Sequence, residues 1–116
     1  MFTIDNLREF GANVDEGLER SLDDEEFYLE LIPTALDESY YKSIDDAVAA
    51  NDLDAAFEAA HALKGVLANL ALTPICEPVS EMTELFRAHT DADYSGYISK
   101  MWEERNRLVE LMERGL

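Results

Sequence analysis

The sequence of 116 residues contains one cysteine, three prolines and five glycines. A single cysteine cannot form an internal disulfide, and Cys76 has no second cysteine at CxxC spacing, so a disulfide scaffold and a cysteine-based metal site are excluded. We expect Cys76 to be a small buried residue in a protein of a reducing compartment. The opening MFTIDNLREF lacks a basic segment followed by an apolar one, so no export signal is seen and we expect a cytoplasmic location.

Positive charge and long apolar runs are also scarce. The uncharged run from Gly65 to Cys76 is far shorter than the ~20 residues of a membrane helix. Nine Lys and Arg residues against 26 Asp and Glu residues leave a formal net charge of -17 at pH 7. This field repels nucleic acids and anionic membranes, so we expect neither as a partner. With 47% hydrophobic residues the chain is nevertheless expected to fold, as one domain over residues 1–116.

Strand signals are missing, because no Asn-Gly or Asp-Gly turn and no persistent alternation of apolar and polar residues occurs. Apolar residues instead recur every three or four positions, which predicts helices. Two short helices are expected within about 3–22, the first with Thr3 as its N-cap and Gly11 as its end. Four longer helices are expected over about 24–50, 52–71, 74–88 and 91–113. The fold class is therefore all-α, an antiparallel up-and-down four-helix bundle with short extra N-terminal helices.

The segment over about 24–50 is predicted to be one long amphipathic helix. Apolar and aromatic residues recur along it every four positions, and an acidic run at 23–26 precedes it. Carboxylates suit the positive end of a helix dipole, so we interpret this run as an N-cap and first turn rather than a cation site. Pro33 removes one backbone donor and should kink the helix.

His61 lies in the middle of the helix expected over 52–71, so the direction of its side chain can be worked out. The apolar stripe of that helix is centred near Ala60; it consists of Leu53, Ala56, Phe57, Ala60, Leu63, Leu67 and Leu70. At about 100° per residue, His61 points roughly 100–120° away from the centre of this stripe. We therefore expect the imidazole to face solvent.

The neighbours of His61 on this surface leave it accessible. Phe57 lies one turn before it, Lys64 and Gly65 one turn after, and Ala68 two turns after. Glycine inside a helix costs about 1 kcal/mol relative to alanine, so Gly65 is a weakness that the helix does not need. Another macromolecule could approach the imidazole here, and a neutral imidazole is a nucleophile that can form a covalent intermediate.

Lys64 could offset the charge of a phosphoryl group that arrives at His61. Taken one at a time, each of these residues has an ordinary explanation: a surface histidine, a solubilising lysine and a chance glycine. Their occurrence together on one helix face favours a functional site.

A metal site is a second interpretation of the same helix. Glu58 and His61 have the Glu-x-x-His spacing of di-iron bundles. Such a site needs a second Glu-x-x-His unit, but Phe86 occupies the position three residues before His89. We therefore predict no metal site, and we expect His89, beside Arg87, to interact with the negative end of a helix dipole.

The segment His61-Ala62-Leu63-Lys64-Gly65 resembles the HxLKG motif of histidine-containing phosphotransfer (HPt) domains. The similarity continues through AAHALKGVLANLALTPI (59–75), and LREFGANVDEGLERSLDDEEFYLELIP (7–33) resembles the lead-in of small single-domain bacterial HPt proteins. The resemblance covers essentially the whole chain. Positions where the family often has small polar residues or glycine hold Val66, Leu67 and Ala71, which bear on which partner fits.

This resemblance implies a phosphorelay carrier rather than an independent enzyme. His61 would accept a phosphoryl group from a receiver-domain aspartate or a sensor kinase and pass it to another receiver. Lys64 would be the charge partner, and Gly65 would leave room for the receiver. With its neighbours on the helix face, Phe57 and Ala68, Gly65 is expected to form the docking surface. The partners would be a response-regulator receiver domain, a hybrid sensor histidine kinase, or both. No cofactor is expected in the chain itself, because Mg²⁺ would be bound by the receiver, and we expect a monomer.

A different class of function remains open at this point. A non-catalytic acidic helical adaptor or decoy could bind a basic protein without covalent chemistry. Such an adaptor would not require an accessible histidine.

Overall fold

The computed structural model describes residues 2–114, and these residues form helices without any strand. In chain order the elements are α1 (Ile4–Phe10), α2 (Val14–Arg20), α3 (Glu25–Leu31), the 3-10 helix η1 (Ile32–Leu36), α4 (Glu38–Ala49), α5 (Leu53–Asn69), α6 (Thr73–Arg87) and α7 (Ser95–Arg114). The prediction of an all-α fold is confirmed. Within this part of the chain, no helix combines the length and the apolar character needed to cross a membrane.

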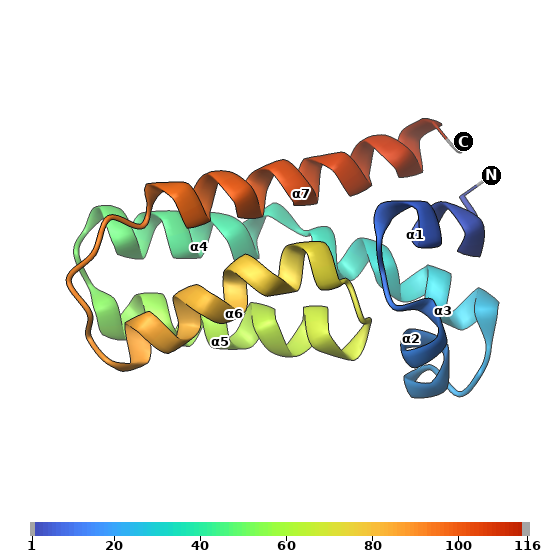
Figure 1. The fold of residues 1–116 in the computed structure, drawn as a ribbon, viewed down its shortest axis with the longest axis horizontal. Helices are drawn as coiled ribbons and strands as arrows, with labels where there is room; N and C mark the ends of the chain where they lie inside the picture. Colours follow the sequence, from blue (N-terminus) through green and yellow to red (C-terminus); the bar gives the residue numbers. More distant parts are fainter. Residues whose placement is uncertain (1, 115–116) are drawn as a thin grey trace.

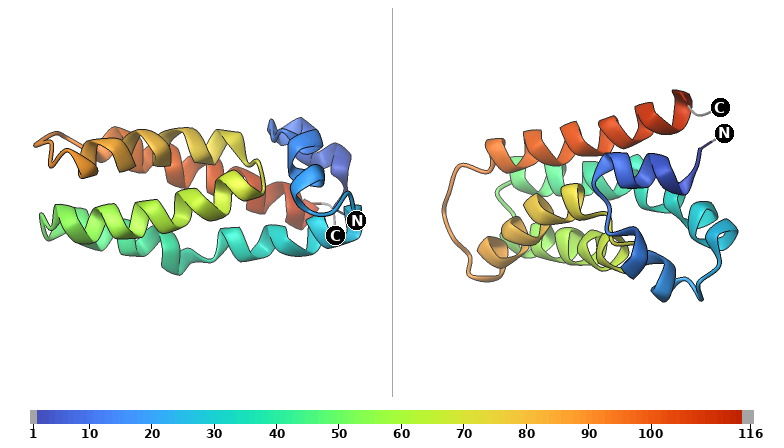
Figure 2. Two further views of the ribbon diagram at one scale, coloured as in Figure 1. Left: turned by 90° about the horizontal axis from the view of Figure 1, so that it is seen from below. Right: turned by 45° about the vertical axis from the view of Figure 1, so that its right-hand side comes forward.

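The four longest helices, α4 to α7, form an antiparallel up-and-down bundle (Figure 1). α5 packs against α4 and α6, and α6 packs against α7. The short helices α1 to α3 gather at one end of the bundle, beside the end of α5, as the two views of Figure 2 also show. The molecule is elongated, with extents of 41 × 26 × 19 Å. Large side chains with no exposed surface fill the bundle, among them Ile44, Leu63, Leu67, Ile75, Met82 and Phe86.

The first helix has the predicted ends. The Thr3 side chain caps α1 by accepting from the Asn6 N–H, and Gly11 ends the helix in the left-handed conformation at φ 107°. This conformation favours glycine, which has no Cβ to clash with the backbone.

The prediction of one kinked helix over 24–50 is wrong, because the chain leaves the helical conformation at Asp37. α3 passes into η1, which has Pro33 as its second residue, and Asp37 then adopts φ -57° and ψ 121°. Its carboxylate caps α4 by accepting from the Ser39 N–H at 2.9 Å. This hydrogen bond holds the pKa of Asp37 below its usual range. Pro33 therefore marks a change of helix type, and the break lies four residues later.

The last helix also begins later than predicted. It starts at Ser95 instead of Asp91, and Asp93 accepts from the Ser95 N–H at 3.0 Å. The connection from α6 is correspondingly longer than the predicted turn. Pro78 lies inside α6 without ending it, and sequence analysis had assigned it no role.

The N-terminal helices are bonded to the end of α5. The Tyr28 hydroxyl on α3 donates to the Leu70 carbonyl at 2.7 Å, and the Asn13 N–H donates to the Ala71 carbonyl at 3.0 Å. Gly17 on α2 makes room for Tyr28, since a Cβ at Gly17 would lie 2.3 Å from the tyrosine oxygen. These contacts fix the end of the helix that carries His61.

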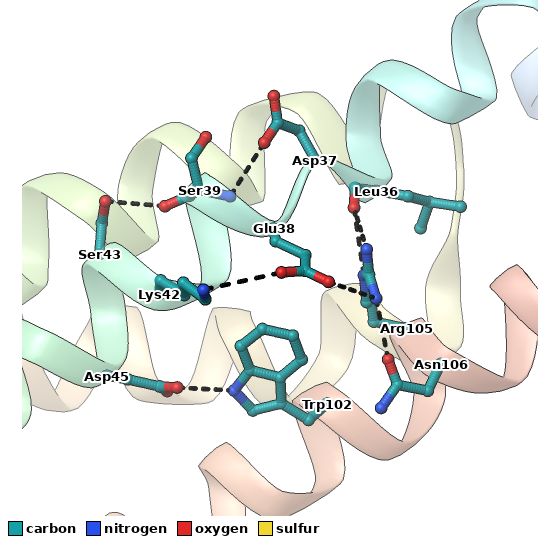
Figure 3. A network of polar contacts seen from close by, with 10 residues as sticks. All are labelled: Leu36, Asp37, Glu38, Ser39, Lys42, Ser43, Asp45, Trp102, Arg105 and Asn106. Atoms are coloured by element: carbon teal, nitrogen blue, oxygen red, sulfur yellow. Dashed lines mark hydrogen bonds and ion pairs between the residues drawn. The ribbon is translucent and has the colours of Figure 1, made fainter.

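A polar network joins α4 and η1 to α7 (Figure 3). The Trp102 indole donates to the Asp45 carboxylate at 2.8 Å. Arg105 donates twice to the Leu36 carbonyl, from Nε at 3.1 Å and from Nη2 at 2.7 Å. Burial raises the pKa of Asp45 above its usual value, although the indole bond opposes this. The network holds the end of η1, and with it the break at Asp37, against α7.

Candidate phosphotransfer site

The helix α5 presents His61 to solvent. Ala60, Leu63 and Leu67 on the same helix have no exposed surface, whereas His61 is exposed. The direction worked out from helical geometry is therefore confirmed. The Asp52 side chain caps α5 by accepting from the Ala55 N–H at 3.0 Å, so one N–H group of the first turn that has no partner within the helix is satisfied.

Phe57 supports the imidazole from the preceding turn. The two rings are stacked, with centroids 5.4 Å apart and planes 13° from parallel. Phe57 is half-buried, so the imidazole packs on a ring that the fold holds in place, while the imidazole itself stays exposed. On α6, the guanidinium carbon of Arg87 lies 4.9 Å from the centroid of the same Phe57 ring.

Lys64 lies on the side of α5 that faces α6. Its Nζ is 3.8 Å from Oε1 of Glu84, and Nε of Arg87 is 3.2 Å from Oε2 of the same carboxylate. One glutamate thus pairs with Lys64, on the turn after the histidine, and with Arg87, which lies over Phe57. None of these three side chains is buried, so they can rearrange when a charged group arrives.

Gly65 opens the surface next to His61. A Cβ placed on Gly65 would meet no atom within 4 Å. The glycine borders a surface hollow between α5 and the η1 segment; its lining includes Leu31, Thr34, Ala62, Val66 and Asn69. Ala68 lines a different hollow, between α5, α2 and α6. The structure therefore brings Phe57, Lys64 and His61 together, with Gly65 at one edge and Ala68 farther along the helix.

Comparison of the sequence with protein-family models identifies the family of this chain. The family model described as Hpt domain matches residues 5–114. The chain belongs to the Hpt domain family. No significant match was found among the curated proteins or among the solved structures.

Membership of this family identifies the kind of activity. An Hpt domain is a histidine phosphotransfer carrier of a phosphorelay, not an independent enzyme, and it interacts with receiver domains. The resemblance drawn from the HxLKG segment is confirmed at the level of the family. The interaction-only adaptor was the alternative, and the family assignment favours the carrier.

His89 of this Hpt domain lies away from the stacked pair of Phe57 and His61. It follows the end of α6 in the left-handed conformation, at φ 52°. Its Nε2 is 2.7 Å from Oδ1 of Asp54, in the first turn of α5. The expected interaction with the end of its own helix is therefore replaced by a contact that ties α6 to α5.

Two further expectations concern metal ligands and Cys76. Across residues 2–114, no three His, Cys, Asp or Glu side chains are grouped so that they could hold a metal ion. Cys76 was expected to be buried, but it is only partly buried, and its Sγ lies 3.6 Å from the Ser80 hydroxyl. It lines the same hollow as Ala68.

Sequence reasoning missed Glu84 and Arg87 as neighbours of the site. Their spacing on α6 indicates an ordinary helix ion pair, and nothing in it points to α5. Only the antiparallel register of α5 and α6 places them beside Phe57 and Lys64. A helical-wheel alignment of the two helices could have suggested this if their register had been known.

Proposed function

We propose that His61 is the phosphoacceptor of this phosphotransfer carrier. The observation that carries the proposal is an exposed imidazole with open space at Gly65 on the same helix. His89, the other histidine of the chain, is bonded to a carboxylate at the end of the bundle. Because Gly65 has no side chain, nothing at that position obstructs a receiver domain that approaches His61.

The transfer step follows from the chemistry of the imidazole. The lone pair of the unprotonated ring nitrogen attacks the phosphorus of the receiver's aspartyl phosphate, and a nitrogen–phosphorus bond forms. The electron pair of the broken phosphorus–oxygen bond returns to the aspartate as a carboxylate. The proton on the other ring nitrogen stays there, so charge balances without an acid or base. The return step, toward a second receiver, is the reverse.

Lys64 supports this step by its charge. The transition state of phosphoryl transfer is loose, so catalysis comes mostly from alignment and from neutralisation of the phosphoryl oxygens. Phe57 supplies alignment by stacking on the imidazole, and Lys64 supplies a cation from the next turn. We propose that the chain holds no cofactor and that Mg²⁺ is bound by the receiver partner.

The docking surface proposed for the receiver consists of Phe57, Gly65 and Ala68. The hollow at Gly65 supports the place of that residue in the surface, because it offers space for an apolar side chain of a partner. The partner would be the receiver of a response regulator or of a hybrid sensor kinase. The monomeric state and the cytoplasmic location stay predictions.

The test is transfer from phosphorylated receivers to the purified protein, with His61→Gln and His89→Gln as paired variants. We expect label that is labile to acid and stable to alkali on the wild type and on His89→Gln, and none on His61→Gln. Circular dichroism of each variant checks its fold. Label that persists in His61→Gln would move the phosphoacceptor to another residue.

A further inference from the structure

Two charged residues of α6, Glu84 and Arg87, contact the neighbours of the proposed phosphoacceptor, Lys64 and Phe57, and have no role assigned to them so far. The Phe57 ring contacts two of these side chains: the His61 imidazole stacks on it with centroids 5.4 Å apart, and the Arg87 guanidinium carbon lies 4.9 Å from its centroid. The imidazole and the guanidinium are therefore within about 10 Å of one another. The Arg87 side chain is long and 54% exposed, which leaves it room to turn toward a phosphoryl group on the imidazole.

Lys64 and Arg87 are held less firmly than two other cations of this chain. Lys64 and Arg87 are two of nine Lys and Arg residues in a molecule of net charge -17. Elsewhere, Arg105 and Arg107 donate to the backbone carbonyls of Leu36 and Phe10, so they are fixed by the fold. Lys64 and Arg87 share the exposed carboxylate of Glu84. Arg105 and Arg107 share carboxylates too, with Lys42 at Glu38 and with Lys100 at Glu104. The difference therefore lies in the bonds to backbone carbonyls, which the described part of the structure gives to neither Lys64 nor Arg87.

The pairing around Glu84 is loose enough to exchange. The side chains of Glu84 and Arg87 are 59% and 54% exposed, and the Lys64–Glu84 distance is 3.8 Å. Exposed ion pairs of this kind contribute little to stability and are easily replaced. A phosphoryl group carries up to two negative charges and three acceptor oxygens, more than one carboxylate offers.

We propose that Arg87 is a second cation for the phosphorylated form of His61, and that Glu84 is a positioning residue that competes with the phosphoryl group for Lys64 and Arg87. This proposal rests on the proposed role of His61. In the unphosphorylated protein, Glu84 holds both cations on the α6 side of the histidine. When the phosphoryl group arrives, the two cations turn to its oxygens and Glu84 is left to solvent.

If Glu84 competes in this way, substitutions of Glu84 and of Arg87 should shift the phosphotransfer equilibrium in opposite directions. Removing Arg87 takes a cation from the phosphorylated form only, so the equilibrium shifts toward the phosphorylated receiver. Removing the Glu84 charge frees both cations and takes away a negative charge near the phosphoryl group, so the equilibrium shifts toward the phosphorylated carrier. A pair that only stabilised the fold would not produce shifts in opposite directions.

The chain offers a matched control on α7. Glu110 and Arg114 form another exposed ion pair within one helix, at 4.0 Å. Glu110→Gln and Arg114→Gln change the net charge by the same amounts as Glu84→Gln and Arg87→Gln. They lie on a helix that carries none of the proposed site residues, so they report the effect of overall charge alone.

The experiment mixes a phosphorylated receiver with the full-length carrier and measures how label divides between the two proteins at equilibrium. We expect Arg87→Gln to lower the carrier's share of label several-fold and Glu84→Gln to raise it several-fold. In the Arg87→Gln background, Glu84→Gln should raise it less, because only Lys64 remains to be freed. Glu110→Gln and Arg114→Gln should stay within about twofold of the wild type.

The possible failures can be told apart. If the wild type takes up no label, or if His61→Gln still does, the proposed function fails and this inference falls with it. If His61 is labelled but Glu84→Gln leaves the division unchanged or lowers the carrier's share, the competition is overturned. If Arg87→Gln matches Arg114→Gln, Arg87 is not part of the site.

Discussion

Arg105 and Arg87 have similar kinds of neighbours, but the Arg105 side chain is held by the fold and the Arg87 side chain is largely exposed. Each guanidinium lies over an aromatic ring and each pairs with a glutamate. The Arg105 side chain is 13% exposed and donates twice to the Leu36 carbonyl (Figure 3). The Arg87 side chain is 54% exposed, and its partner is the exposed carboxylate of Glu84. A charge bonded to backbone serves the fold, whereas a charge bonded to an exposed side chain stays available to a ligand.

Two of the helical glycines, Gly17 and Gly65, repeat this contrast. A Cβ at Gly17 would lie 2.3 Å from the Tyr28 oxygen, and a Cβ at Gly65 would meet nothing within 4 Å. Gly17 lies in a filled interior that leaves no space for a side chain, whereas a side chain at Gly65 would extend into open space. Substitutions at the buried contacts of Gly17, Tyr28 and Arg105 should therefore lower stability, whereas substitutions on the exposed face of α5 should change it little.

The largest expected effect on stability is that of Gly17→Val, which tests the buried contact between Gly17 and Tyr28. Tyr28 has no exposed surface and donates to the Leu70 carbonyl, so it cannot move aside without losing a buried hydrogen bond. We expect the variant to lose about 3 kcal/mol of stability or more in denaturant unfolding. Gly96→Val is the control, because Gly96 is exposed and has open space around it. A loss below about 1 kcal/mol for Gly17→Val would show that the contact is not tight.

Arg105→Met compares the two arginines directly. The substitution keeps the aliphatic stem but leaves the carbonyl of the buried Leu36 without the two bonds from Arg105. We expect a loss of about 2–3 kcal/mol, since hydrogen bonds from charged donors are the stronger ones. Arg87→Met should change stability by no more than about 0.5 kcal/mol. Equal losses in urea unfolding would remove the distinction between the two sites.

The stability of the protein at alkaline pH tests the burial of Tyr28. Burial raises the pKa of Tyr28 to about 12, from 10.0. Because the folded pKa is the higher one, the stabilising contribution is complete below pH 10 and is lost as pH rises toward 12. Between pH 9 and pH 11.5 we expect Tyr28 to account for a loss of about 2 kcal/mol. Tyr28→Phe should be less stable at pH 9 but fall less steeply over this range, and parallel pH curves would contradict the prediction.

Local sequence patterns were sufficient to predict much of the molecule. The spacing of Ala60, Leu63 and Leu67 gave the direction of His61, and Gly11 marked the end of α1. Both features depend on residues within one or two turns, where helical geometry is fixed. The HxLKG segment likewise identified the family from neighbouring residues alone.

Features that depend on distant residues could not be predicted. The break at Asp37 is held by Arg105, whose partner Leu36 is 69 residues away along the chain. The contacts of Glu84 and Arg87 with α5 require the register of two helices, and Gly17 faces Tyr28 across a turn. In each case the sequence shows an ordinary residue, and its role arises only from packing.

The smallest expected effect is on the open face, where Gly65→Ala should stabilise the protein. The helix continues through Gly65 and nothing lies near its Cβ position, so alanine should add about 0.5–1 kcal/mol through helix propensity. Gly65→Gln should keep this gain almost entirely, because glutamine is also a good helix former. Its long side chain nevertheless covers the surface beside His61, so we expect transfer from a receiver to fall more than about tenfold. A Gly65→Gln variant that is stable and transfers at the wild-type rate would place the docking surface elsewhere, and a destabilised Gly65→Ala would mean that the glycine is needed by the fold rather than by a partner.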